Sequence, residues 1–140
     1  MRERGFTLIE LLAVIVILAI IAVITVPKIA DMIESSRKGA AEDAFYGTIK
    51  AAELAWTKQL QSESGTAAGI CDATTNECVD TESGKKYSMS VSGEKAVSGT
   101  ITLDENGSAS VYAGDDLNFN NYYCTGNSSQ ATCNKTKATK

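Results

Sequence analysis

The chain of 140 residues contains no histidine, only one proline and fewer basic than acidic residues. The missing histidine removes the commonest general base near neutral pH, the commonest nitrogen ligand for metals and every triad that contains histidine. The 13 lysines and arginines against 17 acidic residues leave a net charge of −4. A broad basic face for duplex nucleic acid is therefore not expected. We expect no enzyme activity and no cofactor.

The carboxyl-terminal part of the chain is short of large aliphatic residues. From Gln61 onward the only Leu, Ile and Val residues are Ile70, Val79, Val91, Val97, Ile101, Leu103, Val111 and Leu117. So few side chains cannot build a self-sufficient core, and other supports are needed.

What the chain does have is a long apolar run near its start. From Phe6 to Val26 the only charged residue is Glu10. A helix of this length is about 31 Å long, which matches the thickness of a bilayer's hydrocarbon core. The run is longer than the apolar part of a secretory signal, and no small-residue cleavage site follows it. Residues 6–27 are thus predicted to form a transmembrane helix.

Charges and cysteines indicate the orientation of this helix. Arg2 and Arg4 precede the run, so the amino terminus should lie inside the cytoplasm and the rest of the chain outside. All four cysteines fall on that outer side, and their even number and spacing predict two disulfides rather than a zinc site. Three pairings are open, of which the local one has the least loop entropy to overcome: Cys71 with Cys78 and Cys124 with Cys133.

A carboxylate within an apolar run needs an explanation. Two explanations are open: Glu10 lies close to the lipid headgroups, where a charge costs less, or it keeps its charge because a cation meets it. The residues before it, Gly5-Phe6-Thr7-Leu8-Ile9-Glu10, follow a short basic leader and precede the apolar helix. This combination resembles the class III signal of type IV pilins and of the related pseudopilins.

The resemblance implies how the amino terminus is processed and used. A prepilin peptidase would cut between Gly5 and Phe6, removing residues 1–5 as a leader, and would methylate the new amine of Phe6. The carboxylate of Glu10 would then face the Phe6 amine of a neighbouring subunit during assembly. Further implied partners are a platform protein and an assembly ATPase, with membrane lipid as the environment before assembly.

Beyond the run, the pattern changes to that of an amphipathic helix. Pro27 removes one helical hydrogen bond, so a kink is expected there. Six apolar residues then recur at spacings of three and four, as expected for one helix face: Ala41, Phe45, Ile49, Ala52, Trp56 and Leu60. The helix is predicted over residues 6–60, with an apolar first half and an amphipathic second half.

Residues 61–140 are predicted to form a globular head. Alternating apolar residues indicate three antiparallel strands over 86–92, 99–103 and 108–113, and Asn106-Gly107 indicates a hairpin turn. This α+β arrangement, a small sheet on a long helix with disulfide-bearing loops, resembles the pilin fold. By that resemblance, 65–81 is the connecting loop and 115–140 the variable carboxyl-terminal loop.

Two acidic pairs in the head are weak candidates for a calcium site. Asp104 and Glu105 would lie near Asp115 and Asp116 if the strands pair as described, although solvated turn carboxylates are the more common case. Within the family, a head with two disulfides and a long terminal loop rich in Gly, Ser and Asn favours the major subunit of a type IV pilus, made in the cytoplasmic membrane and displayed on the cell surface. The alternatives are a pseudopilin of a type II secretion or DNA-uptake machine, and a membrane-tethered binding domain or enzyme.

Overall fold

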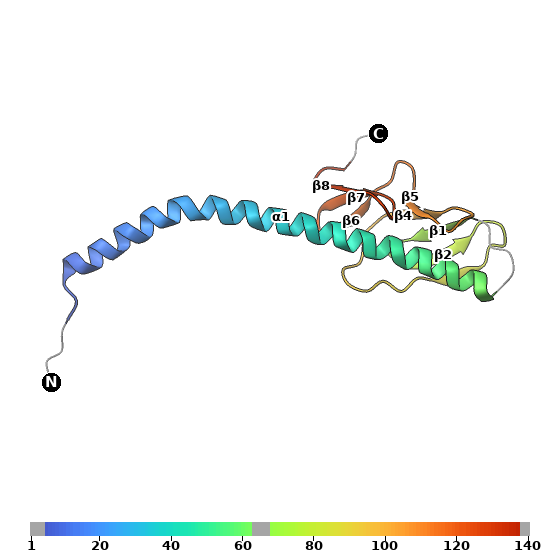
Figure 1. Ribbon diagram of the computed structural model, residues 1–140, viewed down its shortest axis with the longest axis horizontal. Coiled ribbons are helices and arrows are strands. Elements are labelled where there is room, and N and C mark those ends of the chain that lie inside the picture. The colour runs from blue at the N-terminus through green and yellow to red at the C-terminus, as the bar shows by residue number, and fades with distance from the viewer. Residues whose placement is uncertain (1–4, 63–67, 138–140) are drawn as a thin grey trace. The chain divides into compact units, whose positions relative to one another are not determined.

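The computed structural model describes residues 5–62 and 68–137 (Figure 1). The chain divides into two compact units, Met1–Arg37 and Lys38–Lys140. Helix α1 (Leu8–Ser62) contributes to both, and eight short strands follow it within residues 68–137. The expected α+β class, a long amino-terminal helix with antiparallel strands, is confirmed. Four of the five predicted leader residues, 1–4, lie outside the described residues.

In the first unit, helix α1 presents its apolar side chains outward on every side. All described residues up to Arg37 are exposed, and Val23, for example, is 76% exposed. The helix is long and apolar enough to cross a membrane, with a mean hydropathy of 3.1 in its most apolar window of 18 residues. It continues through Pro27 as one helix, and a kink at that residue stays a prediction.

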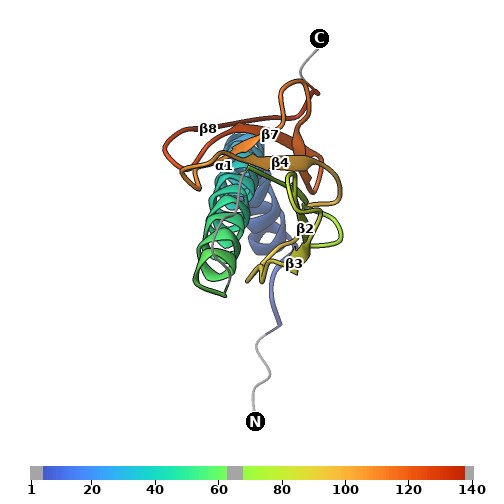
Figure 2. The ribbon, with the colours of Figure 1, turned by 90° about the vertical axis from the view of Figure 1, so that its right-hand side faces the viewer.

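In the second unit, one face of α1 contributes the largest group of buried residues to the hydrophobic core. Phe45, Ile49 and Ala52 are completely buried, and Ala41 and Trp56 are nearly so. Leu60, the last member of the predicted stripe, is partly buried against the same core. The strands lie on one side of this half of the helix and leave its other side uncovered (Figure 2). The spacing in the sequence therefore predicted the buried face correctly.

The strands form two antiparallel sheets. The first has the order β3-β2-β1-β4-β5 and the second the order β6-β7-β8. Isolated bridges from Ser98 to Asn118 and from Ser110 to Asn127 connect the two sheets. The strands are β1 (Gly69–Asp72), β2 (Glu77–Asp80), β3 (Lys86–Ser88), β4 (Thr100–Leu103), β5 (Ala109–Val111), β6 (Leu117–Phe119), β7 (Tyr122–Gly126) and β8 (Ala131–Asn134).

The observed sheets contain more strands than the three that were predicted, and one predicted strand pairs with a different neighbour. The hairpin of β4 and β5 is as expected, with Ile101 opposite Val111. The strand expected at 86–92 is only Lys86–Ser88, and it pairs with β2. The segments expected to be loops at 65–81 and 115–140 contain five strands, and the cysteines lie on four of these. Residues 65–67 of the first segment lie outside the described residues.

The missed strands have a physical reason, which is clearest in the first hairpin. In β1 the buried positions are Gly69 and Cys71, whereas Ile70 points outward and is 40% exposed. In β2 the buried positions are Cys78 and Asp80. Because the disulfide replaces aliphatic side chains on the inner face, the usual alternation of apolar and polar residues is absent.

The hairpin of β4 and β5 is held against α1 at its turn. Gly107 has a φ of 82°, and a Cβ atom there would lie 2.5 Å from the ring of Trp56. Beside it, the amide of Ala109 donates a hydrogen bond of 3.3 Å to Oε1 of Glu53. Glycine is therefore required at this position both by its backbone conformation and by the indole ring above it.

Gly107→Ala should destabilise the head more than Gly84→Ala does. Gly84 also has a positive φ, 68°, but a Cβ atom there meets nothing within 4 Å. Both changes cost about 1–2 kcal/mol of left-handed strain, and only the first adds a clash, worth about 1–3 kcal/mol. Chemical unfolding of the full chain in detergent measures the difference. Equal destabilisation by the two variants would contradict the packing of Trp56 on the turn.

Four hairpin turns begin with an Asp or Asn side chain that accepts hydrogen bonds from the turn's own backbone. In each turn, the Oδ1 atom accepts hydrogen bonds from two backbone amides, with N–O distances of 2.7–3.2 Å. Such bonds favour the turn over extended chain. The four residues are Asp72, Asp80, Asp104 and Asn127.

Asp72 should make the head's stability depend on pH. The amides of Thr74 and Thr75 stabilise its charged form, which lowers the pKa of this carboxyl below its usual 3.8. Its contribution is therefore present above pH 3.8 and is lost as the pH falls through the folded pKa. Unfolding measured at several pH values should show a steeper acid decline for the native chain than for Asp72→Asn, which keeps the acceptor but cannot titrate. Parallel pH profiles would refute this assignment.

Candidate functional site

The first turn of helix α1 contains the one carboxylate of the apolar run. The helix begins at Leu8, so Thr7 is the residue that caps it. Its carbonyl accepts the amide of Leu11 at 3.3 Å, which closes the first helical turn. The residue three positions after the cap is Glu10, as in the reciprocal arrangement called a capping box.

The contacts between Thr7 and Glu10 converge on one carboxylate oxygen. Both the backbone amide of Thr7, at 2.8 Å, and its hydroxyl, at 2.7 Å, donate to Oε2 of Glu10. The amide of Glu10 in turn lies 3.4 Å from the Thr7 hydroxyl oxygen. Oε1 has no hydrogen-bond partner among the described residues, so the carboxylate is fixed in orientation and has one oxygen free for an external donor.

Sequence analysis singled out Glu10 but missed Thr7. The signal was present, because a threonine followed three residues later by glutamate, just before an apolar run, is the pattern of a capping box. The cap explains how a charged side chain can remain at the tip of an apolar helix in a single subunit. Thr7 satisfies part of the hydrogen-bonding capacity of the carboxylate.

Gly5 and Phe6 precede the cap in a segment that is neither helix nor strand. A Cβ atom at Gly5 would meet nothing within 4 Å, so the chain itself has room for a side chain there. Phe6 is 90% exposed. Any requirement for glycine at position 5 must therefore come from a partner that approaches the peptide bond between the two residues.

The cysteines form two disulfides, Cys71 with Cys78 and Cys124 with Cys133. This is the local pairing expected from loop entropy, and each pair joins directly opposite residues of one hairpin. All four side chains are at most 1% exposed. The disulfides therefore replace core side chains in both sheets.

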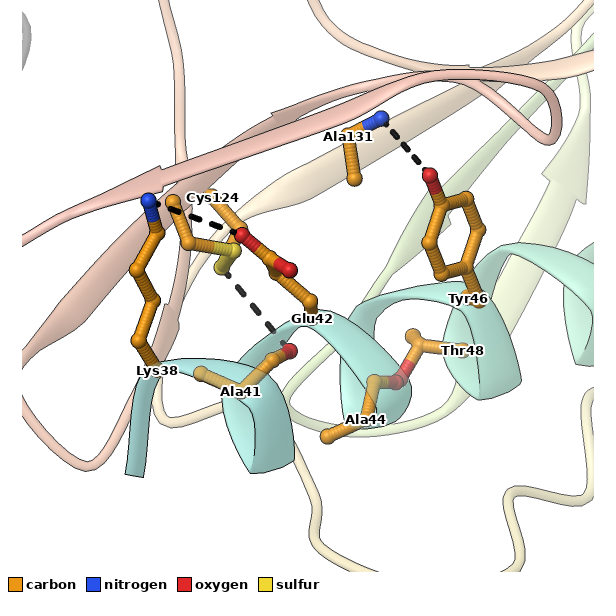
Figure 3. Close-up of a disulfide and its surroundings, with 9 residues drawn as sticks. Lys38, Ala41, Glu42, Ala44, Tyr46, Thr48, Cys124 and Ala131 are labelled. Atoms are coloured by element: carbon orange, nitrogen blue, oxygen red, sulfur yellow. Dashed lines mark hydrogen bonds and ion pairs between the residues drawn. A yellow bond between two sulfur atoms is a disulfide. The ribbon is translucent and has the colours of Figure 1, made fainter. Parts of the chain in front are cut away.

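The second disulfide lies against helix α1 (Figure 3). Its Cys124 sulfur is 3.9 Å from the carbonyl oxygen of Ala41, a packing contact because a disulfide sulfur has no proton to donate. Nearby, the amide of Ala131 donates to the Tyr46 hydroxyl at 3.0 Å. Lys38 and Glu42 form an exposed ion pair of 3.8 Å on the same stretch of helix. The contacts of Cys124 and Ala131 hold the second sheet on residues 41–46.

The two acidic pairs are not brought together, so the expected proximity is wrong. Asp104 directly follows β4 and accepts hydrogen bonds from its own turn. Asp115 accepts the amide of Thr100, at the other end of β4, at 3.0 Å. A four-residue strand separates these ends by about 10 Å. Within residues 5–62 and 68–137, no group of three or more His, Cys, Asp or Glu residues could hold a metal ion.

Comparison with known families finds one match, at the amino terminus. Residues 1–26 match the family described as the prokaryotic N-terminal methylation motif. This motif is the class III signal of type IV pilins and pseudopilins, which implies processing by a prepilin peptidase and assembly into a filament. It points to a structural protein and, with the apolar helix, fits membrane anchoring before assembly. Searches of curated proteins and of solved structures found no match.

Thr7→Val should loosen the first turn of the helix, whereas Thr7→Ser should not. Valine keeps the shape of threonine but removes the hydroxyl that bonds to Glu10. Loss of a cap costs about 1 kcal/mol, so the amide of Leu11 should exchange with solvent about fivefold faster. Hydrogen exchange of the full chain in detergent micelles measures this, and equal protection in both variants would rule out the cap.

Proposed function

We propose that this chain is the major structural subunit of a type IV pilus, stored in the cytoplasmic membrane and assembled into a surface filament through its amino-terminal helix. The observation that carries the proposal is the combination of a helix exposed on every side with a single oriented carboxylate at its tip. Each part alone fits a simple membrane anchor. Together they fit an anchor that must later join copies of itself.

The exposed apolar helix must be shielded from water both before and after assembly. Side chains such as Ile17, 57% exposed, cannot face water over a whole helix without a large free-energy cost. Lipid supplies the cover for a single subunit. In a filament the same surfaces are covered by the helices of neighbouring subunits, so the polymer can leave the membrane.

Glu10 supplies the register of that assembly. Cleavage after Gly5 creates a positively charged amine on Phe6, and methylation of this amine keeps the charge. A carboxylate and an ammonium in an apolar environment each avoid a large desolvation penalty only by pairing with each other. The free Oε1 atom of Glu10 is the acceptor for the Phe6 amine of a neighbouring subunit. Helices that slide out of register leave both charges unpaired.

The partners of the subunit and its successive locations follow from this route of processing and assembly. Residues 1–5 form a leader that a prepilin peptidase removes, and a platform protein and an ATPase then drive assembly. The amino terminus faces the cytoplasm in the membrane-bound subunit. The head of residues 61–140 folds outside the cytoplasm, where its disulfides can form, and is displayed on the surface of the filament.

The head supports a pilus over the alternative, a pseudopilin of a secretion or DNA-uptake machine. Two fully buried disulfides suit a fibre exposed to the environment for long periods. A calcium loop would favour the secretion role, but the acidic candidates lie at opposite ends of β4, where backbone amides satisfy Asp104 and Asp115.

Electron microscopy of filaments sheared from cells, with mass spectrometry of their main component, tests the proposal. We expect filaments composed mainly of this chain, with a first residue of methylated Phe6. A main component of different sequence would reject the role of major subunit. A mature chain that still begins with the leader would reject the processing route.

Glu10→Ala should abolish assembly while leaving the subunit processed and in the membrane. The variant leaves the Phe6 amine unpaired in an apolar environment, and breaking such a pair costs about 3–5 kcal/mol, or more than about a hundredfold in filament yield. Asp31→Ala, which removes an exposed carboxylate outside the apolar run, is the matched control and should assemble normally. Normal filament yield from Glu10→Ala would contradict the pairing.

A further inference from the structure

A polar pocket lies between two hairpin turns of the second unit, the turn between β4 and β5 and the turn between β7 and β8. Its volume of about 340 Å³ is within the range of about 300–1,000 Å³ that is typical of small-molecule sites. Ser110 and Asn127 form an isolated β-bridge, so the two hairpins are joined beside the pocket. The first hairpin contributes Asp104, Ser108 and Ser110 to the lining, and the second contributes Asn127, Ser128 and Ser129.

Both hairpins that form the walls of this pocket are attached to helix α1. In the first, a Cβ atom at Gly107 would lie 2.5 Å from the ring of Trp56, so the turn packs directly on the indole. In the second, the amide of Ala131 donates a hydrogen bond of 3.0 Å to the Tyr46 hydroxyl. The space between the two turns is therefore a fixed feature of the head.

Asp104 offers the pocket a fixed acceptor. Its Oδ1 atom accepts the amides of Asn106 at 3.0 Å and of Ser108 at 2.8 Å, and these two bonds hold the carboxylate in one orientation. Within the described parts of the chain, Oδ2 has no hydrogen-bond partner and the side chain forms no ion pair. Oδ2 is therefore a charged acceptor that is already oriented for the donors of a ligand.

Asn127 offers the pocket fixed donors. Its Oδ1 atom accepts the amides of Ser129 at 2.9 Å and of Gln130 at 3.0 Å. Only the oxygen of a carboxamide can accept two N–H groups, so these bonds also fix the position of the nitrogen. Among the residues that the structure describes, none accepts a hydrogen bond from Nδ2. Both N–H donors of this group are available to a ligand.

The lining of the pocket excludes several classes of ligand. None of its described residues is basic, so a phosphate or a carboxylate ligand would meet no positive charge. Ala109 is the one apolar residue in the described lining, so a hydrophobic ligand would gain little. No group of three or more His, Cys, Asp or Glu residues within 5–62 and 68–137 could hold a metal ion. The lining fits a neutral ligand rich in hydroxyl groups, since each hydroxyl both donates and accepts.

Tyr112 adds an aromatic surface beside this polar lining. It lies two residues after Ser110, so both side chains are on the same face of the chain, about 7 Å apart. The amide of Tyr112 donates to the carbonyl of Thr100 at 2.9 Å, which extends the pairing of β4 and β5 to this residue. Tyr112 is 50% exposed. Its ring offers a flat apolar surface to the C–H face of a sugar, which an acyclic polyol does not have.

We propose that this pocket binds a neutral saccharide unit, a hexose or an N-acetylhexosamine. Hydroxyl groups of the sugar donate to Oδ2 of Asp104 and accept from Nδ2 of Asn127, and its C–H face packs on Tyr112. The site lies entirely in the second unit and does not depend on polymerisation. In the filament proposed above it is repeated on every subunit, so weak binding by single heads adds up to strong attachment to a surface that carries many copies of the sugar.

Nuclear magnetic resonance of the isotope-labelled full chain tests the site. The chain is held in a phosphocholine detergent, because a detergent with a sugar headgroup would compete, and is titrated separately with glucose, galactose, mannose and N-acetylglucosamine. We expect at least one sugar to shift the side-chain amide signals of Asn127, with a Kd of about 1 mM or lower. The absence of saturable shifts with all four sugars, up to about 20 mM, would overturn the proposal.

Conservative variants test the assigned atoms. Asp104→Asn and Asn127→Asp each keep the Oδ1 acceptor of the turn and change only the atom assigned to the sugar. Each should weaken binding about tenfold or more, because a donor or an acceptor is left without its partner. Tyr112→Ala should weaken it about threefold or more. Asp72→Asn makes the same chemical change at a hairpin turn outside the pocket, and as the matched control it should bind like the native chain.

Two further measurements separate the possible outcomes. Thermal unfolding of each variant at neutral pH should match the native chain, which shows that a lower affinity does not come from a lost fold. Calcium chloride is titrated in parallel, and shifts at Asp104 and Asn127 with calcium but with no sugar would overturn the proposal. Native affinity in Asp104→Asn and Asn127→Asp, or in Tyr112→Ala, would do the same. The proposed function rests on the amino-terminal helix, so each of these results leaves it intact.

Discussion

An apolar helix with no protein to cover it is the constraint on which this molecule depends. Up to Arg37 every described side chain faces outward, although most are aliphatic. Such a surface is stable only against lipid or against other helices of the same kind. Residues 8–37 belong to a single helix that cannot bury its own side chains, so the first unit needs a cover that it does not itself provide. In the filament proposed above, the carboxylate of Glu10, oriented by Thr7, selects the helix partners that fit.

The head, in turn, depends on the second half of the same helix. Its own strands are three to five residues long and supply few large apolar side chains. Phe45, Ile49 and Trp56 of the helix complete the core, together with four buried cysteines. One element therefore serves both units: the helix whose first half fits a membrane anchor also contributes the most buried residues to the core of the second unit.

The sequence allowed prediction of those features that follow from periodicity and from familiar turn chemistry. The stripe from Ala41 to Leu60 and the hairpin at Asn106-Gly107 were found in this way. The strands around Cys71 and Cys78 were missed, because their inner face carries sulfur, glycine and aspartate while Ile70 faces outward. At the candidate site, Glu10 was conspicuous as the only charge in its run. Thr7 was overlooked although its capping pattern is present, because the helix was expected to begin at residue 6, which places Thr7 inside the helix, whereas it begins at Leu8.

The placement of the disulfides has a mechanical consequence. Each closes a loop within one hairpin, with sequence separations of 7 and 9 residues. Neither joins a strand to α1, which is attached to the sheets by packing and by hydrogen bonds such as that between Tyr46 and Ala131. Tension transmitted along the helix therefore bypasses the covalent crosslinks. If the sheets separate from the helix under load, each disulfide still keeps its own hairpin closed.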